Sequence, residues 1–405
     1  MLTSVELFAG AGGLGMGLSL AGFEHLAVIE WDRWACDTVR ENQRRGHPLV
    51  ADWPLTEGDV RTFPYEAINR QVDVLAGGPP CQPFSICGKH GAHLDPRDMF
   101  PATVDAVRRL RPRAFIVENV KGLLRESFSS YFSYVTLRLE FPEITGKDGE
   151  AWQEHLRRLQ REKTSGVRKG LTYNVVFQLL NAADYGVAQR RERVFVVGFR
   201  DDLGLRWSFP RPTHSDDSLS VDKWLTGDYW ERHRVPARAR ERAPAHLSRK
   251  LTALHQRNAW PNDEQRAWRT VRDALDGLPD PEREPQAAST IPDHVFQPGA
   301  RFYAGHTGSP LDFPAKTLKA GDHGVPGGEN ALVRQDGSGR YFTIRESARL
   351  QAFPDAYKFH GSWTEAMRQL GNAVPVSLAQ AVGASVARKL IEKDMVSLAG
   401  DAGHA

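Results

Sequence analysis

The sequence has few cysteines and little net charge. Three cysteines occur among 405 residues, at Cys36, Cys81 and Cys87, and this sparse, odd set argues against a disulfide framework. No Cys/His cluster has zinc-ligand spacing, so we expect no metal. The formal net charge is only +3, so the chain is not globally basic. Any binding to nucleic acid must therefore come from local clusters of charge.

The sequence also lacks targeting signals. We find no apolar run long enough to span a bilayer, and the N-terminus has no charged region followed by an apolar signal segment. Hydrophobic residues make up 40% of the chain and charged residues 25%, which is typical of a globular protein. We therefore expect a cytoplasmic protein that does not bind membranes. Its length predicts two or three domains.

The first two hundred residues alternate between short apolar runs and segments of helical periodicity. This alternation predicts βαβ units and a parallel sheet covered by helices. The predicted strands are residues 5–8, 25–30, 72–76, 114–117, 174–180 and 193–199. The predicted helices in this part are residues 14–20, 34–42 and 99–110.

This rhythm breaks twice along the chain. Residues 126–170 are interpreted as an insertion at the sheet edge, of unknown role. From about residue 207 to 340 prolines and glycines are frequent, which indicates a second, smaller domain. Helical patterns return at 344–351 and 375–392. We therefore predict a catalytic and cofactor-binding domain at 1–205, a second domain at 206–342, and a return at 343–405 that completes the first.

A glycine-rich run, residues 8–15, follows the first predicted strand and opens a helix. Glycines let a ligand approach the backbone, and a helix N-terminus offers free N–H groups. The spacing Gly10-x-Gly12-x-x-Gly15 also fits a dinucleotide fingerprint. Glu30, at the end of the second strand, has about the offset of an acid that binds ribose hydroxyls. An NAD-dependent oxidoreductase is therefore an open alternative at this point.

Cys81 lies in a run of glycines and prolines, residues 77–85, directly after a predicted strand. Proline fixes φ and glycine permits unusual backbone, so this pattern is typical of a nucleophile on a shaped loop. Glu118 ends another strand, and the arginine-rich run at 189–193 leads into a further one. Hydride transfer to nicotinamide has no evident use for a thiol, a carboxyl and two arginines at neighbouring strand ends, which argues against the NAD alternative.

Together these segments resemble the DNA (cytosine-5)-methyltransferase family of the bacterial restriction–modification type. They occur in the family's order and span nearly the whole chain, apart from the insertion and the middle domain. The matching segments are residues 8–13, 30–32, 58–60, 79–82, 118–120, 189–193, 345–354 and 369–375. The resemblance implies an α/β, Rossmann-like S-adenosylmethionine-dependent methyltransferase fold. The fold that the resemblance implies has a mixed sheet and a second, smaller target-recognition domain.

The resemblance also implies a reaction. Cys81 would add to C6 of a flipped-out cytosine and so make C5 nucleophilic. Glu118 would hold the N3/N4 edge of the base, with a pKa raised by burial. Arg193 would lie near the base O2, and Arg191 near the active-site loop or a phosphate. The other two cysteines match no family motif and are interpreted as bystanders.

The resemblance implies S-adenosyl-L-methionine as the methyl donor, with its methionine part over the glycine run. Glu30 would hold the ribose hydroxyls, Trp31 would pack on the adenine, and Asp59 would accept from the adenine amino group. The remaining residues expected around the cofactor are Phe8, Ala9, Gly10, Gly12, Gly13, Val60, Pro80 and Asn372.

The expected partner is double-stranded DNA, read by the target-recognition domain. The basic run at 231–250 is either a solvated face or a phosphate-contacting surface. The loop at 84–97 would close over the flipped base. We expect a monomer that works alongside a separately encoded restriction endonuclease. An RNA cytosine-5 methyltransferase is the alternative within the family, and a catalytically inactive DNA-binding relative is a further one.

Overall fold

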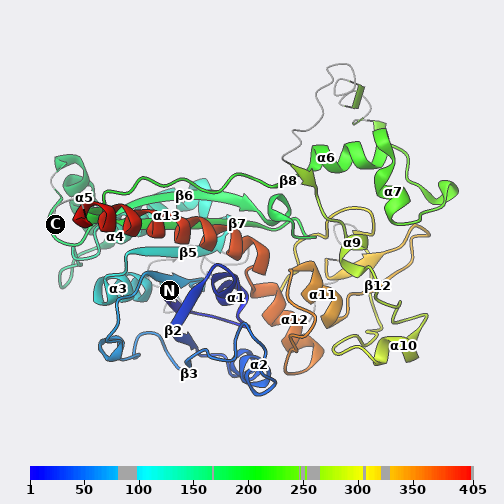
Figure 1. Ribbon diagram of the computed structural model, residues 1–405, viewed down its shortest axis with the longest axis horizontal. Coiled ribbons are helices and arrows are strands. Elements are labelled where there is room, and N and C mark those ends of the chain that lie inside the picture. The colour runs from blue at the N-terminus through cyan, green and yellow to red at the C-terminus, as the bar shows by residue number, and fades with distance from the viewer. Residues whose placement is uncertain are drawn as a thin grey trace. The chain divides into compact units, whose positions relative to one another are not determined.

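The computed structural model describes residues 1–80, 98–166, 168–245, 247, 251–252, 265–303, 307–320 and 329–402, and it divides into two compact units (Figure 1). Unit 1 comprises Met1–Leu180, Glu192–Pro210 and Ala379–Ala405. Unit 2 comprises Asn181–Arg191 and Arg211–Leu378.

A seven-stranded sheet forms the centre of unit 1, with strand order β3-β2-β1-β4-β5-β7-β6. The strands are β1 (Leu2–Leu7), β2 (Phe23–Glu30), β3 (Leu55–Glu57), β4 (Val74–Gly77), β5 (Ala114–Val120), β6 (Tyr173–Asn181) and β7 (Glu192–Arg200). Strand β1 pairs in parallel with both β2 and β4, and β4 pairs in parallel with β5. The predicted alternation of strands and helices is therefore confirmed for this unit.

Strand β7 runs antiparallel to β5, so the sheet is mixed. The mixed sheet implied by the family resemblance is confirmed, whereas the wholly parallel sheet expected from the alternation alone is wrong at β7. The reason is that β6 and β7 are neighbours joined by a connection that holds only the short 3-10 turn Ala182–Tyr185, so the chain turns back and β7 enters the sheet between β6 and β5. A parallel pair needs a crossover of a dozen or more residues, usually a helix, and this connection contains none.

Helices cover both faces of the sheet. They are α1 (Gly13–Leu20), α2 (Arg33–Arg44), α3 (Phe100–Leu110), α4 (Ser129–Glu140), α5 (Trp152–Ser165) and α13 (Val376–Ala402). Strand β1 is buried along its whole length, as expected for a strand with both faces covered. The core on one face joins strand residues such as Leu7 and Phe115 to Phe100 of α3, Val135 of α4 and Leu159 of α5.

The opposite face of the sheet is covered by α1 and α13, which pack closely through glycines. A Cβ added to Gly17 would lie 2.4 Å from the Cβ of Ala379, and one added to Gly383 would lie 2.9 Å from Leu18 Cδ2. Helix α13 is drawn in red along strands β5, β7 and β6 (Figure 1). It is also tied to the start of β5, because Arg113 donates to the carboxylate of Asp394 at 3.1 Å.

The insertion at 126–170 supplies α4 and α5. Its aromatic residues pack on one another inside unit 1, where Tyr134 Oη and His155 Nδ1 lie 2.9 Å apart and the rings of Tyr134 and Trp152 have centroids 5.6 Å apart. Tyr131 and Phe132 belong to the same core. The insertion therefore extends the hydrophobic core of this unit.

One window of 18 residues within Trp363–Val396 has the length and the mean hydropathy, 1.2, of a membrane-spanning helix. This window differs from the expectation that no apolar run is long enough to span a bilayer. However, 67% of the window is buried inside the fold, as in the core helix of a globular protein.

Unit 2 is built from short elements. Its strands form a three-stranded sheet, β10-β11-β12, and a two-stranded sheet, β8-β9. The strands are β8 (His214–Ser215), β9 (Arg266–Ala267), β10 (Ser309–Pro310), β11 (Ala331–Val333) and β12 (Gly339–Tyr341). The helices are α6 (Asp216–Val221), α7 (Asp228–Arg232), α9 (Val271–Leu275), α10 (Pro285–Ser289), α11 (Ile344–Leu350) and α12 (Trp363–Asn372).

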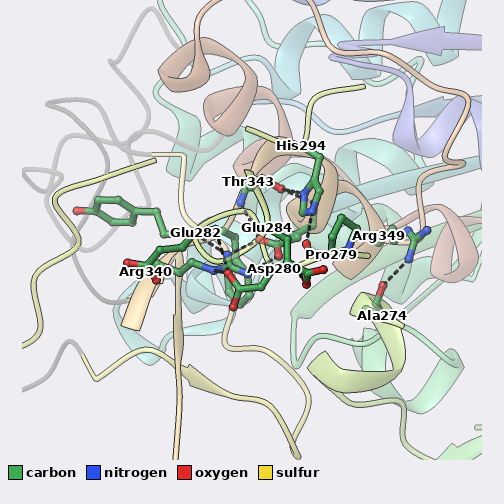
Figure 2. Close-up of polar contacts among 12 residues, drawn as sticks. Ala274, Pro279, Asp280, Glu282, Glu284, His294, Arg340, Thr343 and Arg349 are labelled. Atoms are coloured by element: carbon green, nitrogen blue, oxygen red, sulfur yellow. Dashed lines mark hydrogen bonds and ion pairs between the residues drawn. The ribbon is translucent and has the colours of Figure 1, made fainter. Parts of the chain in front are cut away.

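A buried polar network holds these short elements of unit 2 together (Figure 2). His294 is fully buried, and its ring nitrogens lie 2.8 Å from Thr343 Oγ1 and 2.8 Å from the Pro279 carbonyl oxygen. Arg340 donates to both carboxylate oxygens of Glu346, each at 2.7 Å. Glu346 also accepts from the Thr343 N–H at 2.9 Å and so completes the capping box of α11.

This network explains why the compact units have different bounds from the predicted domains. The predicted return to the first domain begins at residue 343, but α11 is bonded into unit 2 and the chain rejoins unit 1 at Ala379. The predicted bounds are those of functional domains, whereas the two units are defined by compactness alone. The domain bounds therefore stay predictions.

Breaking the Arg340–Glu346 pair is expected to destabilise unit 2 strongly. The two side chains are only 3% and 1% exposed, and Glu346→Gln leaves the buried guanidinium with one carboxylate, Asp280 at 3.3 Å from Arg340 Nε, in place of two. We expect a loss of about 1–3 kcal/mol in the free energy of unfolding, measured by urea denaturation. Lys389→Ala removes an exposed pair with Glu392 and should cost less than about 1 kcal/mol. Equal costs for the two variants would contradict this account.

Candidate functional site

The glycine loop follows β1. The next strands of the chain, β2 and β3, lie on one side of β1, and β4 and β5 lie on the other, so the strand order reverses at β1. In such sheets ligands bind beyond the carboxyl ends of the strands at this switch point. Phe8, Gly10 and Gly12 have φ of 55°, 55° and 88°, so the chain turns sharply as it leaves the strand. A Cβ added to Gly10 would meet no atom within 4 Å. The space beside the loop is therefore open to a ligand lying over the backbone.

Glu30 fixes this loop against the end of β2. Its Oε2 accepts from the Gly10 N–H at 2.7 Å, and its Oε1 accepts from the N–H groups of Trp31 and Asp32 at 2.8 and 2.7 Å. Burial raises the pKa of Glu30, and these three amides oppose that rise. The carboxyl is thereby held in one orientation at the edge of the loop, as an acceptor of ribose hydroxyls must be.

Trp31 and Asp59 supply the groups expected to contact an adenine. The Trp31 side chain is 71% exposed, which leaves a large aromatic face uncovered. Asp59 accepts from the Arg61 N–H at 2.9 Å and from Arg61 Nε at 2.9 Å, and this guanidinium lowers the pKa of the Asp59 carboxyl. Val60 beside it is buried in the core. An open aromatic face and an ionised acceptor fit an adenosine-containing cofactor.

Glu6 is an ionisable residue that the sequence analysis treated only as part of a strand. It is fully buried in β1 beneath the glycine loop, where a Cβ added to Gly15 would lie 2.1 Å from Glu6 Oε2. Burial raises its pKa to about 8, the Gly15 N–H opposes this rise, and the Glu30 carboxyl adds to it. The signal in the sequence was an acid within an apolar strand just before the glycines.

The strand register brings Glu118 beside the loop that leads to Cys81. Gly77 pairs with Val117, and a Cβ added to Gly78 would lie 3.0 Å from Glu118 Oε2. Asn119, to which the sequence analysis gave no role, donates from Nδ2 to the Pro79 carbonyl oxygen at 3.1 Å. Pro80 is the last described residue of this loop, and Cys81 and Cys87 lie outside the described residues.

Glu118 and Arg193 form an ion pair at the ends of neighbouring strands. Arg193 Nε lies 2.8 Å from Glu118 Oε1, and the two side chains are 11% and 9% exposed. The antiparallel register, with Val120 opposite Arg193, places them together. A carboxyl oriented by a guanidinium beside the loop that carries a thiol is an arrangement suited to binding and activating a polar ring.

Two predicted site residues belong to unit 2. Arg191 is fully buried and donates to the carbonyl oxygens of Leu318, Gly371 and Ala373 at 3.0, 2.6 and 2.9 Å. Asn372, between the last two of these residues, is exposed. The expected contact of Arg191 with the active-site loop or a phosphate stays a prediction.

Cys36 has the surroundings of a structural thiol. It is buried in α2 and donates to the Glu30 carbonyl oxygen at 3.4 Å, and burial raises its pKa to about 12. A thiol with such a pKa is a poor nucleophile near neutral pH. In the described part of the chain, no group of three or more His, Cys, Asp or Glu is placed to hold a metal ion.

Comparison with known proteins identifies the fold as that of an S-adenosyl-L-methionine-dependent methyltransferase. The family model described as C-5 cytosine-specific DNA methylase matches residues 2–141 and 158–388. The chain therefore belongs to the C-5 cytosine-specific DNA methylase family, whose cofactor is S-adenosyl-L-methionine. The family model also matches residues 126–141 and 158–170, so the predicted insertion at 126–170 is too wide and only residues 142–157 fall outside the family match.

Relatives agree with this assignment. The Type II methyltransferase M.NgoMIV of Neisseria gonorrhoeae is 30% identical over 404 residues, which cover 96% of this chain and 98% of that protein. The Type II methyltransferase M.PspPI of Psychrobacter sp. (strain TA137) is 30% identical over 392 residues, covering 95% and 79%.

Two solved structures share the fold. A structure described as a DNA modification methyltransferase encoded within an E. coli prophage matches with a TM-score of 0.58 and 20% identity, covering 96% of this chain and 99% of the other. The S. pombe Dnmt2 methyltransferase matches with a TM-score of 0.52 and 18% identity, covering 97% and 99%.

The buried Glu6 carboxyl is expected to make stability fall as pH rises. Its folded-state pKa of about 8 exceeds the ordinary value of 4.5, so between these values the folded state binds more protons than the unfolded state. The free energy of unfolding therefore falls by up to about 1.4 kcal/mol per pH unit in this window. Glu6→Gln should remove this slope in urea denaturation measured from pH 5 to 9.

The exposed Glu392→Gln variant is the matched control for Glu6→Gln. It should keep the pH dependence of the unmodified protein, because Glu392 lies at the surface on α13. Parallel pH curves for Glu6→Gln and the unmodified protein would show that Glu6 is ionised in the folded state, contrary to this account.

Proposed function

We propose that the protein methylates C5 of cytosine within one short sequence of double-stranded DNA, as the modification enzyme of a Type II restriction–modification system. Family membership supports the proposal. So does the match of this chain to a relative named as a Type II methyltransferase, which covers 98% of that relative. The observation that carries it in this structure is the Glu118–Arg193 pair beside Gly78, on the loop that leads to Cys81. A separately encoded endonuclease, a monomeric state and a cytoplasmic location belong to the same proposal.

The proposed reaction begins with extrusion of the target cytosine from the duplex, since C5 and C6 are not accessible from both faces inside the stack. The Cys81 thiolate adds to C6 across the C5–C6 double bond, and C5 then has the nucleophilic character of an enamine carbon. After C5 is methylated, loss of the C5 proton to a base and elimination of the Cys81 thiolate from C6 restore the double bond. Glu118 holds the N3/N4 edge so that charge does not build up on the ring. Arg193 orients that carboxyl through its 2.8 Å contact and lies near the base O2.

The cofactor supplies an electrophilic methyl group when it is bound. Within unit 1 we propose that the backbone of residues 8–13 supports its methionine part and that Glu30 accepts from the ribose hydroxyls. Trp31 would stack on the adenine and Asp59 would accept from its amino group. The exposed indole and the amide-held Glu30 carboxyl support these roles. Gly13, Val60 and Pro80 complete this set in unit 1, and the role of Asn372, which belongs to unit 2, stays an expectation from the family resemblance.

Cys81→Ser is expected to abolish methyl transfer while leaving cofactor binding largely intact, because the thiol acts on the base. The unmodified protein should form a stable adduct with duplex DNA containing 5-fluorocytosine in the presence of S-adenosyl-L-methionine, and Cys81→Ser should form none.

Glu118→Gln should lower the rate of methyl transfer by roughly 10²–10⁴-fold. Bisulfite sequencing of DNA from expressing cells should show methylation in one short sequence only with active protein.

RNA of the same sequence is the control substrate for the adduct experiment. Adducts on RNA but not on DNA would replace the DNA proposal with the RNA alternative. An adduct that survives Cys81→Ser, or loss of cofactor binding in that variant, would contradict the role of the thiol.

The described arginines of the basic run at 231–250 divide into two groups, and Arg249 and Lys250 lie outside the described residues. Arg232 pairs with Asp222 at 3.5 Å, and Arg240 pairs with Glu231 at 2.6 Å, so these two are engaged within unit 2. Three others are exposed, and in the described part of the chain they have no ion-pair partner. These are Arg234, Arg238 and Arg242. We propose that this second group contacts DNA phosphates.

Replacing the three exposed arginines by alanine is expected to weaken DNA binding in a salt-dependent way. For each arginine that binds a phosphate, the replacement should reduce the slope of log K against log salt concentration by about 0.9, as measured by fluorescence anisotropy of a labelled duplex. The double variant Arg232→Ala/Arg240→Ala is the matched control and should leave the slope unchanged. Equal slopes for the triple variant and the unmodified protein would assign the run to a solvated face.

A further inference from the structure

Two side-chain hydrogen bonds within unit 1 hold the chain on either side of the segment at 81–97. This segment carries Cys81 and lies outside the described residues, whereas the residues that lead into it and out of it are described. Asn119 donates to the backbone at the entry, and Tyr131 donates to a side chain at the exit. All these residues belong to unit 1.

Asn119, near the end of β5, fixes the backbone just before Cys81. Its Nδ2 donates to the Pro79 carbonyl oxygen at 3.1 Å, and its Oδ1 accepts from the Val120 N–H at 2.9 Å. An amide that is bonded at both ends has one orientation, and this residue is only 3% exposed. Pro79 precedes another proline, Pro80, so the backbone between this bond and the thiol has little freedom.

Asp98 holds the exit of the segment. Its Oδ1 accepts from the Phe100 N–H at 3.1 Å, at the first residue of α3, and its Oδ2 accepts from the Tyr131 hydroxyl. Phe100 is buried in the core of unit 1. One carboxylate therefore ties the chain at position 98 both to the start of α3 and to α4.

Tyr131 is itself held firmly in α4. It is buried, and its ring packs edge-on against the rings of Phe100 and Trp152, with 6.4 Å between centroids in both pairs. Burial and the Asp98 carboxylate raise the pKa of the Tyr131 phenol, so the hydroxyl keeps its proton and donates it to the carboxylate. Such a bond to an ionised acceptor is stronger and more directional than one between neutral groups.

Tyr134, one turn later on α4, has a hydroxyl that serves only the core. Its Oη lies 2.9 Å from His155 Nδ1 in α5, and its ring lies against Trp152 with 5.6 Å between centroids. The two tyrosines thus share one aromatic cluster. They differ in the part of the chain that each hydroxyl holds.

We propose that Asn119 and Tyr131 are positioning residues for methyl transfer, because they fix the entry and the exit of the segment that carries Cys81. This inference rests on the role proposed for Cys81 and adds the residues that keep the thiol in place. A chain segment with both ends fixed has fewer conformations than one with a free end. Rates are sensitive to this, since a misplacement of about 1 Å can lower them about a hundredfold.

The first test is Tyr131→Phe, which removes one hydroxyl and keeps the ring. The single-turnover rate of methyl transfer to duplex DNA should fall about tenfold, and the rate of adduct formation with 5-fluorocytosine DNA should fall in proportion. The Kd for S-adenosyl-L-methionine without DNA should change by less than about twofold, because the proposed role of this hydroxyl is only to hold the thiol segment.

Tyr134→Phe is the matched control for Tyr131→Phe. It removes a hydroxyl from the same cluster, so it should lower the melting temperature to a similar extent while leaving the single-turnover rate unchanged. If Tyr134→Phe slows the reaction as much as Tyr131→Phe does, the effect belongs to the stability of the cluster and the inference is overturned.

The second test is Asn119→Ala, which removes the bond nearest the thiol. The single-turnover rate should fall about a hundredfold, again with a nearly unchanged cofactor Kd. Asn174→Ala is its control, because Asn174 donates to Asp201 at 2.6 Å on β6 and should not affect the rate. A circular-dichroism melt shows whether each variant is folded, and Asn119→Ser replaces Asn119→Ala if the latter is unfolded.

A double-mutant cycle tests whether Tyr131 acts through Asp98. Asp98→Ala should slow methyl transfer, and adding Tyr131→Phe to it should slow the reaction by less than about twofold more, because the acceptor is already gone. Effects on the rate that multiply in full would show that Tyr131 acts by another route, contrary to the inference.

An unchanged single-turnover rate in Tyr131→Phe or in the folded Asn119 variant would overturn the role of that residue. So would a raised cofactor Kd that accounts for the slower reaction. Failure of the proposed function is a separate outcome, because the unmodified protein would then form no adduct and transfer no methyl group to DNA.

Discussion

The parallel pairing of β1 with both β2 and β4 is the constraint on which the proposed site depends. Leu7 lies opposite Ile29 on one side and Gly77 on the other, and Gly77 lies opposite Val117. The loops that follow β1, β4 and β5 therefore leave the sheet at one edge. A slip of one residue in β5 would turn Glu118 to the other face of the sheet and break its contact with Arg193.

Much of this arrangement could be predicted from local signals. The strands of unit 1 are short apolar runs, and a glycine run after the first of them predicts a turn that other residues disfavour. Gly10 and Gly12 do have positive φ. The positive φ of Phe8 could not be predicted, because its residue type disfavours that conformation and only the surrounding bonds impose it. The helix α12 was missed as well.

The buried charges could not be predicted, because burial and pairing are set by residues distant in the sequence. Glu6 reads as one acid in a strand, and its raised pKa comes from the burial that the fold imposes. Arg340 and Glu346 are only six residues apart, but nothing in their spacing shows that both are withdrawn from water. Such pairs contribute to a unique packing only when every polar group finds a partner.

The contrast between Arg191 and Arg193 shows why a motif does not assign roles to its members. Only Glu192 separates them, and their chemistry is identical, yet they belong to different compact units. Arg193 needs one donor aimed at a carboxyl in the neighbouring strand. Arg191 needs several donors spread in a plane, because its acceptors come from positions 127, 180 and 182 residues away. A lysine supplies a compact point charge with no such fork, so arginine at this position is required by geometry rather than by charge.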